Sequence, residues 1–113
     1  MRQFLRSKIH KARVTGADVN YIGSVTLDQE LMERAGIAEW EKVLIVDNTN
    51  GARLETYAIV GEPGSGVVQI NGGAAHLVKP GDEVIILTFE IADSPSGPIQ
   101  LLVDAQNKFV RYL

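Results

Sequence analysis

The sequence predicts a small, mainly β protein that folds as a β-barrel with little helix. Its apolar runs are at most four residues long, which is the length of buried strands, and turn-forming clusters such as Pro63-Gly64-Ser65-Gly66 separate them. Only one stretch has the periodicity of an amphipathic helix. Many short strands with little helix favour a small barrel over a sandwich.

Length and composition indicate one domain, residues 1–113, with an ordinary hydrophobic content of 45%. The net charge of −3 gives no electrostatic case for binding nucleic acid. No run approaches 18 apolar residues, and the first residues lack the apolar core of a signal peptide, so we expect no membrane association. The absence of cysteine rules out disulfides and thiolate metal sites, and it fits a cytoplasmic location.

The helix is predicted after the first quarter of the chain. Its apolar stripe repeats at i, i+4 and i+8, at Leu27, Leu31 and Ala35. Thr26 and Gln29 have the spacing of a capping box, and Asp28 is an equally good N-cap. Gly36 is a natural stop, which limits the helix to about two turns.

A hairpin is predicted in the middle of the chain. Asn50-Gly51 is a strong turn signal between the apolar run 43–46 and the alternating segment 53–60. Further strands are expected over residues 9–14, 67–70, 84–87, 99–103 and 108–112, with one helical turn over 74–78. Residues 41–46 also match residues 82–87 in pattern, which indicates two similar half-units and a pseudo-symmetric barrel.

The candidate for chemistry is Gly23-Ser24. Glycine leaves its carbonyl unshielded and permits strained backbone angles. A serine hydroxyl held against that carbonyl can convert the amide to an ester. Elimination of the ester's carboxylate then gives dehydroalanine, and hydrolysis gives a pyruvoyl group. A Gly-Ser pair is more often an ordinary loop, and Ser24 lies outside any G-x-S-x-G elbow.

Arg53 and Tyr57 share one face of the predicted strand 53–60. Arginine can hold a carboxylate through two hydrogen bonds, and tyrosine can donate a proton. The alternative is a surface arginine and a half-buried tyrosine. Thr56 points the other way under strict alternation, so a bulge, a strand end or a subunit boundary must bring Thr56 to the same site.

The segment Asn71-Gly72-Gly73-Ala74-Ala75 offers exposed N–H groups and close backbone approach, which suit a carboxylate or oxyanion. A turn that opens a helical turn is the alternative. Lys8 and His10 alternate on the first strand and are expected on a solvated face. His76 is more typical of a partly buried structural histidine, and neither histidine has the spacing of metal ligands.

These motifs, in this order, resemble the aspartate 1-decarboxylase family of pyruvoyl-dependent enzymes. The matching stretches are Lys8-Ile9-His10, Tyr21-Ile22-Gly23-Ser24, Asn50-Gly51-Ala52-Arg53, Thr56-Tyr57-Ala58-Ile59, Ile70-Asn71-Gly72, Ala74-Ala75-His76 and Pro80-Gly81-Asp82. They cover most of the chain, and the ordered set is specific although no single stretch is.

The resemblance implies a six-stranded double-psi β-barrel with short helices that assembles as a homotetramer. It implies a lyase that converts L-aspartate to β-alanine and carbon dioxide through a Schiff base, for pantothenate and coenzyme A synthesis. The cofactor would be a covalent pyruvoyl group made from Ser24, with no metal. Self-cleavage would give chains 1–23 and 24–113, and because processing can require an accessory factor, a maturation factor is a further expected partner.

The resemblance also implies roles for individual residues. Lys8 and Arg53 would bind the substrate carboxylate, and Tyr57 would protonate the carbanion left after carbon dioxide departs. Thr56 would assist self-processing and contact the substrate. Further substrate contacts are expected from Asn71 and from the backbone of Gly72, Gly73 and Ala74.

The chain departs from the family pattern at three positions. Many members have histidine where this chain has Asn20 and alanine where it has Gly73, and some have tryptophan where it has Val46.

The alternative function is a non-catalytic small β-barrel that serves as a binding module. The variant Ser24→Ala separates this alternative from the enzyme, because a binding module should keep its ligand affinity. A further alternative is a barrel whose Ser24 never matures. Such a protein would contain no pyruvoyl carbonyl and would not react with a carbonyl reagent.

Overall fold

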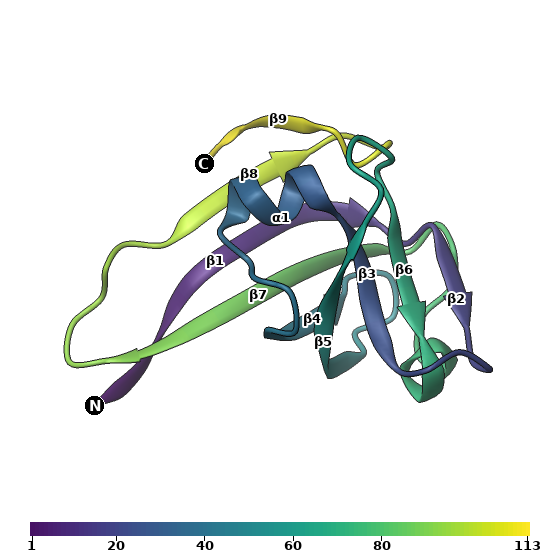
Figure 1. Ribbon diagram of the computed structural model, residues 1–113, viewed down its shortest axis with the longest axis horizontal. Helices are drawn as coiled ribbons and strands as arrows, with labels where there is room; N and C mark the ends of the chain where they lie inside the picture. The colour runs from purple at the N-terminus through teal and green to yellow at the C-terminus, as the bar shows by residue number, and fades with distance from the viewer.

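The structure, a computed structural model, describes residues 1–113 and confirms the predicted mainly β fold (Figure 1). The helical elements are α1 (Gln29–Ala35) and the 3₁₀ helix η1 (Gly72–His76). Neither has the length and apolar character that crossing a membrane requires. The strands are β1 (Arg2–Arg13), β2 (Gly16–Asp18), β3 (Ser24–Asp28), β4 (Lys42–Asp47), β5 (Arg53–Gly61), β6 (Val68–Asn71), β7 (Glu83–Ala92), β8 (Ile99–Val103) and β9 (Phe109–Tyr112).

The strands form one sheet in the order β2-β6-β3-β5-β4-β7-β1-β8-β9. The chain passes from β1 to β2 through Val14 and Thr15, whose N–H groups donate to Asp82 O (2.9 Å) and Val68 O (2.8 Å). One extended N-terminal segment therefore contacts both β6 and β7, an arrangement consistent with a small barrel. If β1 and β2 are counted as one strand, the strands from β2 to β1 in this order number six, as predicted for the barrel. Strands β8 and β9 extend the sheet beyond these six. The double-psi crossover stays a prediction.

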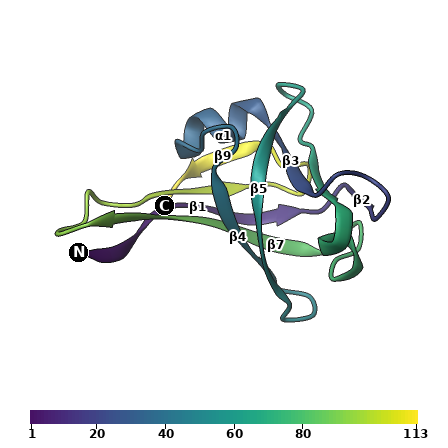
Figure 2. The same ribbon diagram turned by 60° about the horizontal axis from the view of Figure 1, so that its bottom comes forward.

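Strand β1 is longer than predicted, because it begins at Arg2 instead of at residue 9. It pairs antiparallel with β7 over most of its length and parallel with β8 from Ser7 to His10. Strand pairing on both sides thus compensates for a charged sequence that carries little strand signal. Figure 2 shows β1 and β7 continuing together beyond the body of the molecule as a ribbon.

Helix α1 has the predicted length and stop. Asp28 is its N-cap, because its Oδ1 accepts a hydrogen bond from Glu30 N at 2.8 Å. The capping box predicted for Thr26 is wrong, since Thr26 lies inside β3. Gly36 ends the helix in the left-handed conformation, with a φ of 71°.

The predicted hairpin is present as β4 and β5, which pair in unbroken antiparallel register from Lys42↔Tyr57 to Val46↔Arg53. Gly51 supplies a φ of 80° in the connecting turn. The two similar apolar stretches noted in the sequence lie side by side, because β4 also pairs with β7.

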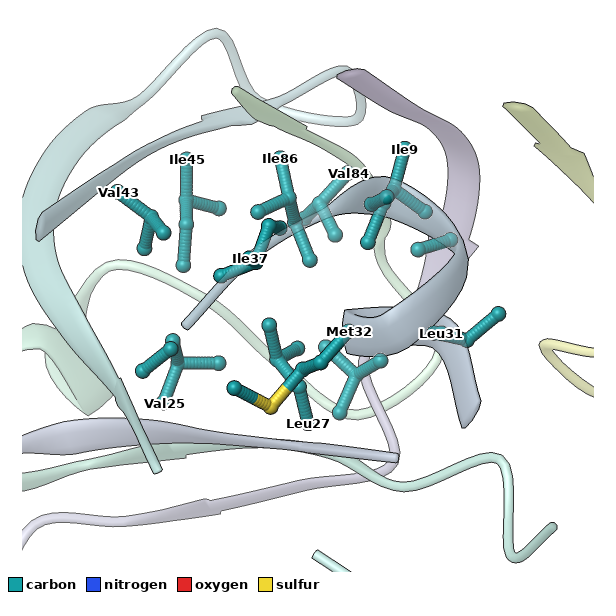
Figure 3. Close-up of a cluster of buried hydrophobic side chains, with 14 of the residues drawn as sticks. Ile9, Val25, Leu27, Leu31, Met32, Ile37, Val43, Ile45, Val84 and Ile86 are labelled. Carbon is teal, nitrogen blue, oxygen red and sulfur yellow. The ribbon is translucent and has the colours of Figure 1, made fainter. Parts of the chain in front are cut away.

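One hydrophobic core fills the space between the strands and α1 (Figure 3). Ile9, Val25, Ile45 and Ile86 from four different strands are completely buried in it. Figure 3 shows Ile37 between the side chains of β4 and β7 on one side and those of β3 on the other, with Met32 of α1 beside Leu27. The alternation of the strands leaves every second side chain on the outer face, where the candidate site lies.

A buried pair of carboxyl groups joins two turns of the barrel. Asp47 and Asp82 are 0% and 4% exposed, and each carboxyl group shifts the pKa of the other. Asp47 Oδ1 also accepts from Thr49 N at 2.7 Å, and Asp82 Oδ2 accepts from Lys79 N at 3.0 Å. Burial raises the pKa of Asp47, whereas the neighbouring Asp47 carboxyl lowers the pKa of Asp82. Of the two carboxyl groups, Asp47 is therefore the one that takes up a proton more readily.

Candidate functional site

Ser24 is the first residue of β3, and its side chain is 2% exposed. It lies opposite Asn71 in the antiparallel pair of β3 and β6. Asn71 Nδ2 donates to Ser24 Oγ at 2.9 Å and to Thr26 Oγ1 at 3.3 Å, while Gln69 Nε2 donates to Asn71 Oδ1 at 3.1 Å. An amide donor in this position stabilises negative charge that develops on the serine oxygen.

Gly72 packs directly against the residue before Ser24. A Cβ atom at Gly72 would lie 2.7 Å from Gly23 Cα and 3.0 Å from Gly23 N. Gly72 also has a φ of 74°, which side chains rarely adopt. Glycine is thus required twice at this position, by space and by backbone conformation. A Cβ at Gly23 itself would meet only Asn71 O, at 4.0 Å.

The sequence drew attention to Gly23, but the sterically constrained glycine of the site is Gly72. The two residues are far apart in the chain, so no local pattern indicates their contact. A Cβ atom at Gly73 would meet nothing within 4 Å, so alanine would fit at this position. The backbone at Gly73 is therefore open to an approaching ligand on this side.

The residues before the Gly23-Ser24 bond form an exposed turn. Asp18 Oδ1 accepts a hydrogen bond from Asn20 N at 3.0 Å, which is an Asx turn. Tyr21 and Ile22 are 54% and 80% exposed. The bond therefore joins an accessible turn to a buried strand, and Asn20 takes part in this turn through its backbone.

Tyr57 lies next to Ser24 on the neighbouring strand. The parallel pairing of β3 with β5 begins at Val25↔Ala58, and Ser24 and Tyr57 directly precede these two buried residues. Because side chains alternate, Ser24 and Tyr57 share the face opposite to the core. Asn71, Ser24 and Tyr57 consequently form a row across β6, β3 and β5.

Thr56 does not join this row through its side chain. The register between β4 and β5 contains no bulge, and Thr56 pairs with the core residue Val43. Its half-buried side chain thus points to the opposite face from Tyr57. Of the routes that could unite the two residues, a bulge is ruled out within this strand pair, which leaves a strand end or a subunit boundary.

Arg53 and Lys8 lie away from Ser24 within one chain. Arg53 is four residues before Tyr57 on β5, which corresponds to about 13 Å along a strand. Lys8 is on β1, which β5, β4 and β7 separate from β3 in the sheet order. Neither side chain forms an ion pair. Both cations are therefore available for an external carboxylate, but a single chain does not bring them to the serine.

Helix η1 follows Asn71 directly, so Gly72, Gly73 and Ala74 form the start of a helical turn as well as a backbone surface. The first N–H groups of a helix have no partner within it and can bind an anion. The interpretation as a helical turn is confirmed, whereas binding of a carboxylate or oxyanion by this backbone stays a prediction. No three histidine, aspartate or glutamate side chains gather where they could hold a metal ion.

Comparison with known families gives one decisive match. The family model described as aspartate decarboxylase matches residues 1–110. The chain belongs to the aspartate decarboxylase family. The resemblance predicted from the ordered motifs is therefore confirmed, and membership indicates a lyase that decarboxylates aspartate.

Proposed function

We propose that this aspartate decarboxylase cuts its own Gly23-Ser24 bond and uses the resulting pyruvoyl group to convert L-aspartate to β-alanine and carbon dioxide. The observation that carries the proposal is the buried hydroxyl of Ser24, which accepts a hydrogen bond from Asn71 at 2.9 Å. This hydroxyl sits beside a glycine whose backbone is held by contact with Gly72. Contacts on both sides limit how far either reacting group can move away from the other.

The proposed cleavage balances without an external oxidant. Ser24 Oγ forms an ester with the Gly23 carbonyl carbon while the peptide C–N bond breaks and the nitrogen takes up the hydroxyl proton. Loss of the Ser24 Cα proton expels the carboxylate of Gly23, which ends chain 1–23. Water then hydrolyses the remaining dehydroalanine, releases ammonia and leaves the carbonyl at the start of chain 24–113.

The residues present fit a pyruvoyl group at position 24. The hydrogen bonds of β3 to β5 and β6 would hold the new chain end, and Tyr57 and Asn71 flank it on the same face. When formed, the group supplies a carbonyl that binds the substrate amine and accepts the electrons released with carbon dioxide. Tyr57 is then the proton donor for the carbon that has lost its carboxylate.

Binding of the remaining substrate carboxylate requires a second copy of the chain in this proposal. Lys8 and Arg53 are free cations, yet the strand order keeps Lys8 away from Ser24 within one chain. A neighbouring subunit could supply them, and Thr56 likewise. This need supports an oligomer, and we propose a homotetramer as the active assembly. We extend the proposal to β-alanine supply for pantothenate synthesis in the cytoplasm, with a maturation factor as a further partner.

Intact-mass spectrometry under denaturing conditions tests the proposal. The 12.3 kDa chain should be replaced by two fragments that end at Gly23 and begin at the converted Ser24. The larger fragment should react with phenylhydrazine, and Ser24→Ala should remain uncut and inactive. A protein that stays at 12.3 kDa after long incubation and releases no carbon dioxide from aspartate would contradict the proposal.

A further inference from the structure

Trp40, the only tryptophan of the chain, has an unusual backbone conformation. It lies between α1 and β4 with a φ of 71°. A bulky residue rarely adopts this left-handed region, where asparagine or glycine is favoured. Trp40 is also 68% exposed, so burial of the indole does not explain its presence. A strained and exposed tryptophan points to a role other than stability.

The backbone around Trp40 is fixed to the strand that carries Tyr57. Trp40 N donates to Ala58 O at 2.7 Å, and Ala58 N donates to Glu41 O at 2.9 Å. The side chain of Glu41 accepts from Ala38 N at 2.9 Å and is ion-paired with Arg6. The loop thus has several independent attachments, and its position relative to β5 is well defined.

These attachments place the indole against the phenol. The ring centroids of Trp40 and Tyr57 are 6.0 Å apart with an interplanar angle of 31°. This separation is within the range of interacting aromatic pairs. The hydroxyl of Tyr57 forms no hydrogen bond within the chain, so the indole is the contact that can define how the phenol is oriented.

We propose that Trp40 is a positioning residue for Tyr57. Its ring holds the phenol on the face that carries Ser24 and shields one side of the phenol from water. The proposal rests on the proposed role of Tyr57 as proton donor. Asparagine would suit this backbone conformation better, but only the indole can keep the donor in place.

Two substitutions at Trp40 separate its ring from its backbone strain. Trp40→Asn removes the indole and relieves the backbone, so it should raise the melting temperature and lower kcat about tenfold, with KM nearly unchanged. Trp40→Phe keeps an aromatic ring and should keep most of kcat. The matched control is Lys11→Asn, which relieves another left-handed residue, with a φ of 67°, and should change kcat little.

A second measurement needs no mature enzyme. In a Ser24→Ala background the fluorescence emission of Trp40 should change when Tyr57→Ala removes the neighbouring ring. Tyr57→Phe in the same background keeps a ring and should leave the emission close to that of the parent protein. The other two tyrosines form no ring contact with Trp40.

The outcomes distinguish this inference from the proposed function. A mature, active protein in which Trp40→Asn leaves kcat unchanged would overturn the role of Trp40 alone. An emission that Tyr57→Ala leaves unchanged would overturn the ring contact. A wild-type protein that releases no carbon dioxide would overturn the proposed function and, with it, the role of Trp40, even if the change in emission is observed.

Discussion

Two clusters of buried polar side chains differ in how they satisfy their hydrogen bonds. At the candidate site, Asn71 and Ser24 form a neutral pair of an amide and a hydroxyl. At the junction of two turns, Asp47 and Asp82 form a pair of carboxyl groups whose pKa values are shifted in opposite directions. The first cluster should keep its geometry over a wide pH range, whereas the second should make the stability of the fold depend on pH.

The difference indicates that the group proposed to react and the groups that titrate lie in separate parts of the molecule. The group proposed to react has a partner that does not ionise, so its alignment does not depend on the protonation of its neighbour. The titrating pair lies at the turns before Arg53 and before β7, outside the row of Asn71, Ser24 and Tyr57. Substitutions at the two clusters should therefore separate effects on cleavage from effects on stability.

The largest effect is expected at Gly72, whose backbone holds the neutral cluster against the bond to be cut. Gly72→Val introduces a Cβ 2.7 Å from Gly23 Cα at a φ of 74°. It should destabilise the fold by about 3 kcal/mol and prevent cleavage. Thermal unfolding and intact mass measure the two effects.

Gly73→Ala is the matched control, because the position is open and has ordinary backbone angles. It should cut at the normal rate and keep its melting temperature. If Gly72→Val were cut as fast as the control, contact with Gly72 would not position the bond.

A smaller effect is expected when the neutral pair loses its donor. Asn71→Ala removes the hydrogen bonds to Ser24 and Thr26 and should destabilise the fold by about 2 kcal/mol. Cleavage should slow about a hundredfold, as for the loss of one oxyanion donor. The appearance of fragment 1–23 over time gives the rate.

Thr26→Val controls for the second hydrogen bond, since it removes only the longer contact of 3.3 Å. Its cleavage rate should stay near that of the wild type. Equal slowing of both variants would show that the amide acts through the general packing of this face and not through Ser24.

The smallest effect is expected at the carboxyl pair, and its sign follows from the two pKa shifts. The lowered pKa of Asp82 contributes stability above the ordinary aspartate value, and this contribution is lost as the pH falls through the pKa of the folded protein. The raised pKa of Asp47 contributes stability that is complete below the ordinary value and is lost as the pH rises. The contribution of this pair to stability should therefore be highest near pH 4 and decline toward neutral pH.

Asp47→Asn should remove this decline, because an amide in place of the Asp47 carboxyl does not ionise at any pH. Melting curves from acid to neutral pH should show the variant a few degrees more stable than the wild type at pH 7 and about equal near pH 4. Its rate of cleavage should be unchanged. A parallel pH profile of the two proteins would exclude the raised pKa of Asp47 as the cause of the decline.

Local patterns predicted much of this fold. Helix α1 follows from one apolar stripe and from Gly36, and the β4–β5 hairpin from Asn50-Gly51 and its flanking strands. The start of β1 at Arg2 was not predictable in this way, because its extended form depends on pairing with β7 and β8, which come much later in the chain.

The candidate site likewise contains residues with a local sequence signal and contacts that have none. The sequence indicated Ser24, Tyr57 and Asn71 separately, and the strand register places them in one row. The Gly72–Gly23 contact and the Trp40–Tyr57 pair had no local signal, since each depends on residues that meet only in the folded sheet. Whether Lys8 reaches the site depends on assembly, which neither sequence periodicity nor one chain determines.

Strand β1 determines what a cut after Gly23 would leave behind. The 23-residue peptide would contain all of β1, with Ile9 and Ala12 buried in the core and hydrogen bonds to β7 on one side and β8 on the other. It would stay in place as a non-covalent subunit. An affinity tag on Met1 should therefore purify both pieces together, dialysis should not separate them, and only denaturant should release the short one.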